Sequence, residues 1–226
     1  MSKAEEYQPG KHKLFPVILT GNEEISPGVH VISWKRNSDF LPGQVVKIAL
    51  NENDQPRIYS LCSGNHEKEM RMLFNIKKEG ELTPKLSSCI PGETIWVSKA
   101  YGSFTDGDQP AFRIATGTGI APFYSMFRSG QEKDKTLIHG ARYLNQFYFE
   151  DELDWALGER YIRCCSQEQS CDVFPGRVTD YLRQLETLPA DHLYYLCGNA
   201  LMVVEVRDLL IERGIPYKNI IAEIYF

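Results

Sequence analysis

The sequence predicts two domains of different fold class: an N-terminal antiparallel β-barrel over residues 1–108 and a C-terminal α/β domain with a parallel sheet over residues 109–226. The first half has short strand-like runs between turn signals and almost no helical periodicity, which is typical of barrels and sandwiches. The second half alternates strand and helix patterns, which is typical of a parallel sheet covered by helices on both faces. The polar stretch Thr105–Pro110 is the expected boundary.

Strands of the first half are expected over residues 29–34, 44–50, 70–77 and 94–98, with turn residues such as Pro42-Gly43 between them. A further strand opens at Arg57. One short helix is expected over Thr83–Ser88, with Thr83 as the N-cap. Pro84 would then stand at the first helical position, where a proline is tolerated because its missing N–H is not needed there.

Strands of the second half are expected over residues 111–115, 136–139, 161–165, 192–197 and 220–225. Helices are expected to begin at Ile120 and to run over residues 149–157, 178–185 and 200–213. In the last of these helices the apolar residues recur at helical spacing and share roughly one face. These residues are Val203, Val204, Val206, Leu209 and Leu210.

Composition excludes several classes of function. The chain has 226 residues, of which 42% are hydrophobic and 24% charged, and its net charge is −5. That charge gives no support for nucleic-acid binding. No segment approaches the ~18 consecutive apolar residues of a membrane span, and the polar first residues do not resemble an export signal. We therefore expect a cytoplasmic protein without a membrane partner.

Six cysteines are scattered along the chain without C-x-x-C spacing. Together with the absence of an export signal, this predicts reduced thiols, no iron–sulfur cluster and no metal site. For Cys62, Cys89 and Cys164 a buried position as a small apolar residue is expected.

A glycine-rich segment, ATGTGIAP, begins at Ala115 and connects an expected strand to an expected helix. Glycines allow close approach of the backbone to a phosphate, and the free N–H groups of a helix start favour an anion. The candidate phosphate-binding residues are Thr116, Gly117, Thr118 and Gly119. Alone the signal is weak, because such a turn can be a simple tight connection and Pro122 replaces the third glycine of GxGxxG.

A second motif, Arg57-Ile58-Tyr59-Ser60, ends a polar loop and opens an apolar strand. Strand alternation would put Arg57 and Tyr59 on one face and Ser60 on the other. A guanidinium can pair with a pyrophosphate, a phenol ring can stack on a flat heterocycle, and a hydroxyl can donate to a ring nitrogen. By itself the tetrapeptide reads better as an ordinary edge strand with a surface arginine.

Together, in this order and about 60 residues apart, the two motifs resemble the ferredoxin–NADP reductase family, above all its compact bacterial members. The resemblance extends over nearly the whole chain. It implies a flavin-binding barrel followed by a nucleotide-binding domain, with FAD and NADP(H) as cofactors and NAD(H) as an alternative nucleotide. It also implies that Arg57 holds the flavin pyrophosphate, that Tyr59 packs on the isoalloxazine, and that Ser60 bonds near its N5.

The resemblance assigns further flavin contacts after this motif. Ile76 and Lys77 match the strand that lines the flavin, and the segment Gly80-Glu81-Leu82-Thr83 matches the family's GxxS/T phosphate turn. In the alternative reading, Gly80 is only a hairpin glycine and Thr83 only a helix cap.

Residues near the C-terminus match the part of the family's site that meets the nicotinamide. Cys197-Gly198 matches the CG motif at a strand end, and Glu223 and Tyr225 match a terminal Glu-x-Tyr whose tyrosine covers the flavin. With Ser60, the residues Cys197, Glu223 and Tyr225 are the expected catalytic group. Phe226 is expected either to stack on the flavin adenine or to pack into the sheet.

The resemblance also implies a site for the 2′-phosphate of NADP(H). Arg142 and Arg177 match two of the three arginine positions of compact bacterial relatives, while Ser166-Gln167 stands where Thr-Arg or Ser-Arg is expected. A neutral glutamine supplies no charge, and Glu168 is near enough to compete with the phosphate. Two arginines therefore favour NADPH, by a smaller margin over NADH than a complete site would give.

The implied activity is hydride transfer between NADP(H) and flavin, with single electrons passed to or from a ferredoxin or flavodoxin. A reductase that feeds an oxygenase or a cytochrome and an NAD(P)H:flavin reductase are alternatives, and a flavin-binding regulator without activity is less favoured. An acidic carrier would need a local basic patch on this acidic chain. The candidates for that patch are Lys35, Arg36, Lys47, Lys77 and Lys85. The oligomeric state is left open.

Overall fold

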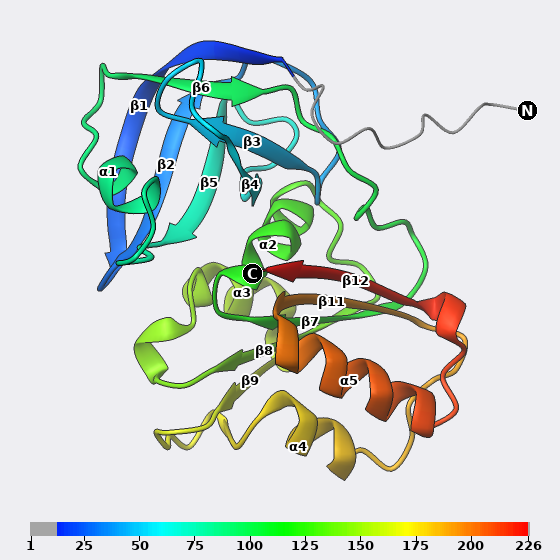
Figure 1. Cartoon of the computed structure of the whole chain (residues 1–226). Coiled ribbons are helices and arrows are strands. Elements are labelled where there is room, and N and C mark those ends of the chain that lie inside the picture. The colour runs from blue at the N-terminus through cyan, green and yellow to red at the C-terminus, as the bar shows by residue number, and fades with distance from the viewer. Residues whose placement is uncertain (1–12, 226) are drawn as a thin grey trace, which may run out of the picture.

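Two six-stranded sheets, one antiparallel and one parallel, form the fold of the computed structural model, which describes residues 13–225 and, for Tyr225, the backbone only (Figure 1). The antiparallel sheet uses the first half of the chain and the parallel sheet the second half, so the predicted fold class is confirmed. The division into domains at residues 108 and 109 stays a prediction. Among the described residues, no helix combines the length and the apolar character needed to cross a membrane.

The first sheet has the strand order β4-β3-β6-β1-β2-β5 and carries one short helix, α1. An isolated bridge between Leu61 and Met72 brings the end of β4 to β5 and curls the sheet into a barrel. Its interior is apolar, with Trp34, Ile48 and Phe74 at its centre. Its elements are β1 (Leu14–Ser26), β2 (Val29–Lys35), β3 (Val45–Ala49), β4 (Arg57–Ser60), β5 (Glu69–Asn75), α1 (Thr83–Ser87) and β6 (Thr94–Ser98).

Strand β1 was not predicted. It contains Pro16, the turn-like pair Gly21-Asn22 and two glutamates, so it lacks a clean alternation of apolar and polar residues. Its pairing with β2 shifts register twice, which lets one long strand bend and pair with both β2 and β6. The Asn22 amide donates to the carbonyls of Leu86, Ser87 and Cys89, and so holds the end of α1 against the barrel.

The start of α1 corrects one prediction. Leu82, not Thr83, is the N-cap, and Pro84 lies within the first turn as expected. The Thr83 hydroxyl instead accepts the backbone N–H of Lys77 at 2.8 Å. The side chain therefore closes the preceding turn and does not cap the helix.

The second sheet is parallel throughout and has the order β10-β9-β8-β7-β11-β12. Its strands are β7 (Ala111–Thr116), β8 (Lys135–Ala141), β9 (Tyr161–Cys165), β10 (Phe174–Pro175), β11 (Leu193–Asn199) and β12 (Ile220–Tyr225). Its helices are α2 (Ala121–Arg128), α3 (Glu150–Leu157), α4 (Val178–Gln184) and α5 (Ala200–Glu212). Short 3₁₀ turns add η1 (Gly117–Ile120), η2 (Leu144–Gln146), η3 (Gly158–Arg160) and η4 (Tyr217–Asn219).

Helices cover both faces of the parallel sheet. Helices α4 and α5 pack on the face away from the barrel, whereas α2 and α3 lie on the face toward it (Figure 1). On α5, Val203 and Val206 are buried as expected, but Val204 is 38% exposed because it points away from the sheet. Of the cysteines expected in cores, Cys62 and Cys164 are buried and Cys89 is half-buried.

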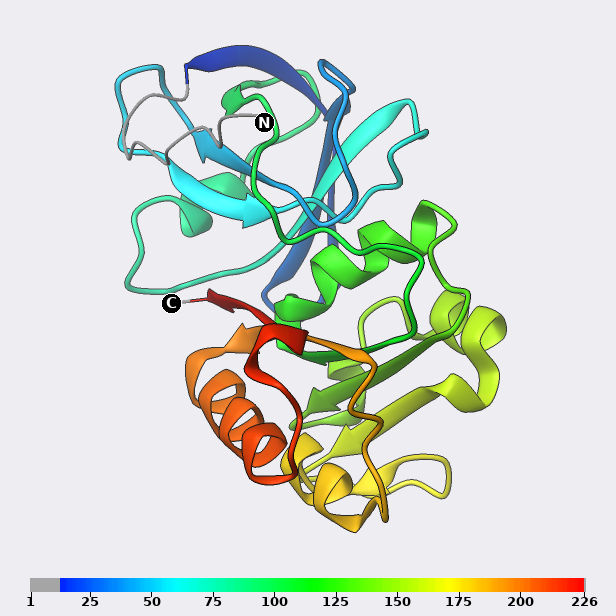
Figure 2. The same ribbon diagram turned by 90° about the vertical axis from the view of Figure 1, so that its right-hand side faces the viewer.

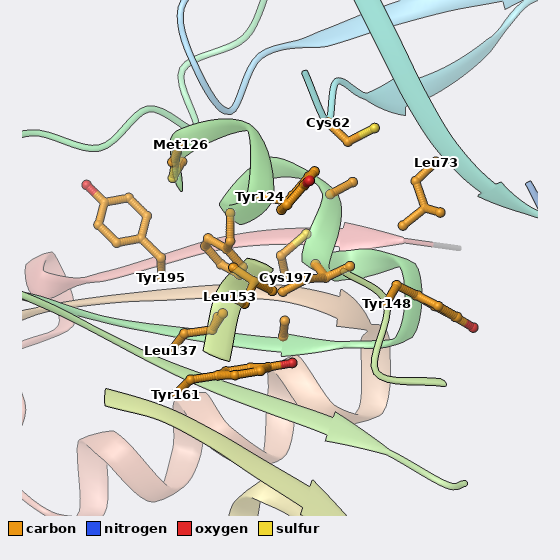
Figure 3. Packing of buried hydrophobic residues seen from close by; sticks show 14 of the residues in the cluster. Cys62, Leu73, Tyr124, Met126, Leu137, Tyr148, Leu153, Tyr161, Tyr195 and Cys197 are labelled. Carbon is orange, nitrogen blue, oxygen red and sulfur yellow. The ribbon is translucent and has the colours of Figure 1, made fainter. Parts of the chain in front are cut away.

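One apolar core continues from the barrel to the parallel sheet. Cys62 and Leu73 come from the barrel, and they belong to the same buried cluster as Tyr124 on α2 and Cys197 on β11 (Figure 3). The two parts are therefore packed together through α2. This packing holds the end of β4 close to the parallel sheet.

Figure 2 shows the segment that links the two sheets as it runs from the barrel to the parallel sheet. Buried charges hold this segment in place. The Asp106 carboxylate is fully buried and pairs with Arg113 at 2.7 Å and with Lys135 at 3.1 Å. Lys135 also donates to the carbonyls of Gly107 and Gln109. These contacts hold the linking segment against the starts of β7 and β8.

Candidate functional site

The carboxyl ends of the parallel strands lie at one edge of the sheet, the edge toward which the β12 arrow points (Figure 1). In chain order β7 is followed by β8 on one side and later by β11 on the other, so the strand order reverses between β7 and β11. Such a switch point opens a crevice in which parallel sheets bind ligands. The predicted residues at this edge are Thr116, Arg142, Ser166, Arg177, Cys197, Gly198 and Tyr225.

At the switch point the glycine-rich segment interlocks with the end of β11. A Cβ at Gly119 would lie 2.4 Å from the Cys197 carbonyl oxygen, so only glycine fits there. Gly198 has φ +134°, and a Cβ on it would lie 2.5 Å from the Thr116 hydroxyl. That hydroxyl accepts the backbone N–H of Asn199 at 3.2 Å. The sequence motif therefore has a structural role as well as an expected ligand role.

Gly117 differs from these two glycines. It has φ +55°, and no atom lies within 4 Å of the position its Cβ would take. Its outer side is open, and Gly117 begins the turn η1 that leads into α2. A backbone that is exposed at the start of a helix is suited to bind an anion.

Three of the four expected catalytic residues come together although they lie far apart in sequence. Ser60, at the end of β4, donates its hydroxyl proton to the Glu223 carboxylate at 2.8 Å. Glu223 lies on β12 beside Cys197 of β11 in the register of the two strands. Ser60 and Cys197 are buried, and burial raises the pKa of Glu223 above its usual range, against the opposing effect of the Ser60 hydrogen bond.

Strand β4 offers a mixed polar and apolar edge next to this group. Arg57 and Ile58 are both exposed, because β4 is an edge strand and simple alternation does not separate them. Tyr59 is half-buried, and its ring meets the Phe74 ring edge-on at 6.4 Å. Burial raises the pKa of Tyr59 to about 12, so its phenol stays protonated at neutral pH.

The turn after β5 is closed by two of the predicted residues. Gly80 donates its N–H to the Lys77 carbonyl at 2.8 Å, and a Cβ on Gly80 would lie 3.1 Å from that same oxygen. Lys77 in turn donates to Thr83, as described above. Ile76 donates to the carbonyl of Gly28, and Leu82 is half-buried at the start of α1. Thr83 therefore closes the turn by a hydrogen bond, and the backbone leaves little room for a Cβ at Gly80, whatever the turn binds.

The expected 2′-phosphate residues lie on two loops joined by hydrogen bonds. Ser166 and Gln167 donate backbone N–H groups to the carbonyls of Ala141 and Arg142, at 3.1 and 3.0 Å. The Arg142 side chain is exposed. Glu168 accepts the N–H of Leu144 at 2.6 Å, so its carboxylate is partly engaged by the neighbouring loop.

Arg177 stands on the next loop, where it is the N-cap residue of α4. Its backbone N–H donates to the Asp180 carboxylate at 2.9 Å, and its side chain is exposed. The guanidinium is thus accessible to solvent at the carboxyl edge of the sheet.

A cleft of about 800 Å³ lies between the barrel and these loops and was not predicted. It is lined on the barrel side by Ile76 and on the other side by Tyr143 and Glu168. Ser26 donates to the Asn145 carbonyl at 3.0 Å, which ties the β1–β2 turn to the loop after β8. The cleft therefore connects the expected flavin strand with the expected nucleotide loops.

Two C-terminal predictions lie outside what the structure describes. The backbone of Tyr225 pairs with Asn199 at the end of the sheet, but its side chain and the whole of Phe226 are outside the described residues. Their contacts with a flavin stay predictions. Within the described residues, no group of three or more His, Cys, Asp or Glu side chains could hold a metal ion.

Comparison with known proteins identifies relatives of this chain. The family described as oxidoreductase NAD-binding domain matches residues 114–208. The chain is 29% identical over 230 residues to a flavodoxin/ferredoxin–NADP reductase of Buchnera aphidicola, covering 90% of this chain and 86% of that protein. It is 32% identical over 213 residues to ferredoxin–NADP reductase A of Sorangium cellulosum, covering 80% and 76%.

The fold is also similar to that of a solved structure. A ferredoxin NADP⁺ reductase of Neisseria gonorrhoeae, determined with bound FAD and NADP, superposes with a TM-score of 0.84 at 21% identity, covering 96% of this chain and all of that one. The chain belongs to the ferredoxin–NADP reductase family, as its motifs predicted.

Proposed function

We propose that this protein is an FAD-dependent oxidoreductase that passes hydride between NADP(H) and its flavin, and single electrons to or from a small electron-carrier protein. The observation that carries the proposal is the Ser60–Glu223 hydrogen bond, which joins the flavin motif of the barrel to the last strand of the parallel sheet. Hydride transfer between two cofactors requires such a meeting of two binding parts. Membership of the family supports the same activity.

The barrel side of the site fits a flavin dinucleotide. β4 offers an exposed guanidinium, an exposed apolar side chain and a half-buried phenol within one short strand. The guanidinium can pair with a pyrophosphate, and the apolar side chain and the phenol ring can pack on a flat ring system. The residues that would hold FAD are Arg57, Ile58, Tyr59, Ser60, Ile76, Lys77, Gly80, Leu82 and Thr83, with Tyr225 and Phe226 covering it.

The carboxyl edge of the parallel sheet fits a nicotinamide nucleotide. The open backbone of Gly117 at the start of η1 suits a pyrophosphate, and the exposed guanidinium groups of Arg142 and Arg177 suit a 2′-phosphate. The residues that would hold the nucleotide are Thr116, Gly117, Thr118, Gly119, Arg142, Ser166, Arg177, Cys197 and Gly198. NADPH is the proposed nucleotide, and NADH is accepted less well.

When bound, the flavin and the nicotinamide supply the hydride and single-electron chemistry, while the chain positions them and controls protons. The Ser60 hydroxyl, hydrogen-bonded to Glu223, can hold or pass a proton at its Oγ atom. Burial raises the pKa of Glu223, so this carboxyl accepts a proton more readily than an exposed one. Cys197 is buried and lies beside Glu223 in the register of β11 and β12, where it would shape the site without acting as a nucleophile.

The electron carrier is proposed to be a ferredoxin or a flavodoxin. Lys47 lies on β3 beside Ile58 of β4, so a basic side chain stands next to the proposed flavin strand. Because the net charge of the chain is −5, an acidic carrier must be steered by a local patch of this kind. A cytoplasmic location is part of the proposal, since all six cysteines are free thiols.

Purification followed by acid extraction and chromatography tests the cofactor. FAD is expected in roughly one-to-one ratio with the chain because the residues proposed to hold the dinucleotide extend from β4 to the turn after β5. Recovery of FMN alone, or of no flavin, would refute the proposal. NADPH-dependent reduction of ferricyanide, and then of added ferredoxin or flavodoxin, tests the reaction. Turnover only with an oxygenase or cytochrome, or release of reduced flavin, would assign one of the two alternative reductase activities.

A further inference from the structure

His139 is a buried polar residue that the sequence motifs did not single out. It lies on β8 beside Ala115 of β7, and its side chain is completely buried. It shares a face of β8 with Leu137, the face covered by α2 and α3. A histidine in such a place must find partners for both ring nitrogens or leave one unsatisfied.

Neighbouring side chains fix the orientation of the His139 ring. Its Nδ1 atom lies 3.0 Å from the hydroxyl of Tyr161, on β9. The ring of Phe147 meets it edge-on at 5.2 Å. Figure 3 shows Tyr161 on the sheet beside Leu137, so the phenol approaches His139 along the same face. These two contacts orient the imidazole ring, and they leave its Nε2 atom directed away from Tyr161.

The Nε2 atom of His139 makes no hydrogen bond of good geometry within the part of the chain that the structure describes. Burial lowers the pKa of His139 to about 3, and the backbone of Gly117 opposes this effect. A neutral imidazole has one donor and one acceptor nitrogen. If the Tyr161 hydroxyl donates to Nδ1, the proton of the neutral ring is on Nε2. The backbone of Gly117 favours the protonated ring, so its interacting group is the carbonyl, which accepts a hydrogen bond.

The carbonyl of Gly117 and the N–H of Thr118 belong to one peptide unit. Because that unit is planar and trans, its C=O and N–H point in opposite directions. If the carbonyl turns inward to His139, the Thr118 N–H turns away from His139. The position that a Cβ of the neighbouring Gly117 would take is open. Because Gly117 has no Cβ, this peptide can adopt more orientations than it could after another residue. A hydrogen bond from His139 would favour one of these orientations.

We propose that His139 is a positioning residue that, held by Tyr161, donates from Nε2 to the Gly117 carbonyl and thereby aims the Thr118 N–H at the pyrophosphate of the bound nucleotide. The inference rests on the proposed nucleotide site. It adds two residues of β8 and β9 to the machinery of that site, although neither touches the ligand.

The test uses the FAD-loaded protein and two amide variants of matched polarity. In H139Q the amide nitrogen takes a place close to that of Nε2, whereas in H139N the amide reaches only the place of Nδ1. Binding of NADP⁺ is measured from the change in the flavin spectrum, and binding of 2′-AMP, which has no pyrophosphate, is measured by competition. H139N should weaken NADP⁺ binding about tenfold, as expected for one hydrogen bond, and H139Q should restore it to within about threefold.

The 2′-AMP affinity should remain within about twofold in both variants, because the effect acts only through the pyrophosphate. Tyr161→Phe provides a second, milder variant, which releases the ring and should weaken NADP⁺ binding without altering 2′-AMP binding. Unchanged NADP⁺ binding in H139N, equal weakening of both ligands, or no recovery in H139Q would overturn the proposal. Failure of the unaltered protein to bind NADP⁺ would instead refute the proposed function itself.

Discussion

Replacing Asp106 with asparagine should destabilise the protein strongly and leave its chemistry intact. The carboxylate is fully buried and accepts from Arg113 Nε at 3.0 Å, from Arg113 Nη2 at 2.7 Å and from Lys135 Nζ at 3.1 Å. Asparagine keeps the volume but removes the charge, so two buried cations lose their counterion. Removing one partner of a buried ion pair costs about 3–5 kcal/mol.

Thermal unfolding of the D106N variant measures this effect. For a chain of this length, 1 kcal/mol corresponds to about 2–4 °C, so the melting temperature should fall by about 6–20 °C. Asp208→Asn is the matched control, because Asp208 pairs with Arg207 at the surface, where both side chains are well exposed. That change should cost less than about 0.5 kcal/mol. A loss below about 1 kcal/mol in D106N would show that the backbone carbonyls around Lys135 and Arg113 suffice for the buried cations.

Three further predictions concern the site. The effects of Ser60→Ala and Glu223→Gln on NADPH:ferricyanide turnover should be non-additive. The coupling free energy should be about 1.5–3 kcal/mol, as for a hydrogen bond to a charged group. Additive effects would contradict direct cooperation of the two side chains. Burial raises the pKa of Glu223, so the folded wild type holds this proton more tightly than the unfolded chain does. Relative to Glu223→Gln, the wild type should therefore lose stability as the pH rises from the ordinary carboxyl pKa through the raised pKa. Denaturation at several pH values measures this loss. Arg142→Ala and Arg177→Ala should lower kcat/KM for NADPH and spare NADH; equal losses would mean that these arginines do not read the 2′-phosphate.

Local patterns in the sequence were sufficient to predict most of the fold. Strands β6, β9 and β12 begin and end where turn signals and apolar runs place them. Strand β1 was missed because its register shifts and charged residues hide the alternation, and β10 because two residues are too few to form a pattern. Both depend on neighbouring strands for their existence, and periodicity within one segment carries no information about its neighbours.

The sequence motifs predict the residues of the site, but they do not predict the contacts that bring those residues together. Ser60 and Glu223 were each expected at the site by resemblance, yet their hydrogen bond spans 163 positions and depends on how the barrel packs on α2. The ion pairs of Asp106 also depend on that tertiary arrangement. Neither contact has a signal at short range in the sequence.

The contact between His139 and Tyr161 is also a tertiary contact without a short-range signal in the sequence, because it depends on the register of β8 and β9. Tyr161 is opposite Leu137, and Arg163 is opposite His139, so the phenol of Tyr161 reaches the His139 ring diagonally across β8 and β9. From the sequence alone, a histidine in an apolar strand is indistinguishable from an ordinary buried residue. Only the parallel register, which also puts His139 beside Ala115 at the end of β7, brings its ring under the glycine-rich turn. The ligand-facing motif and its inner support are therefore encoded in different strands, and the sheet itself connects them.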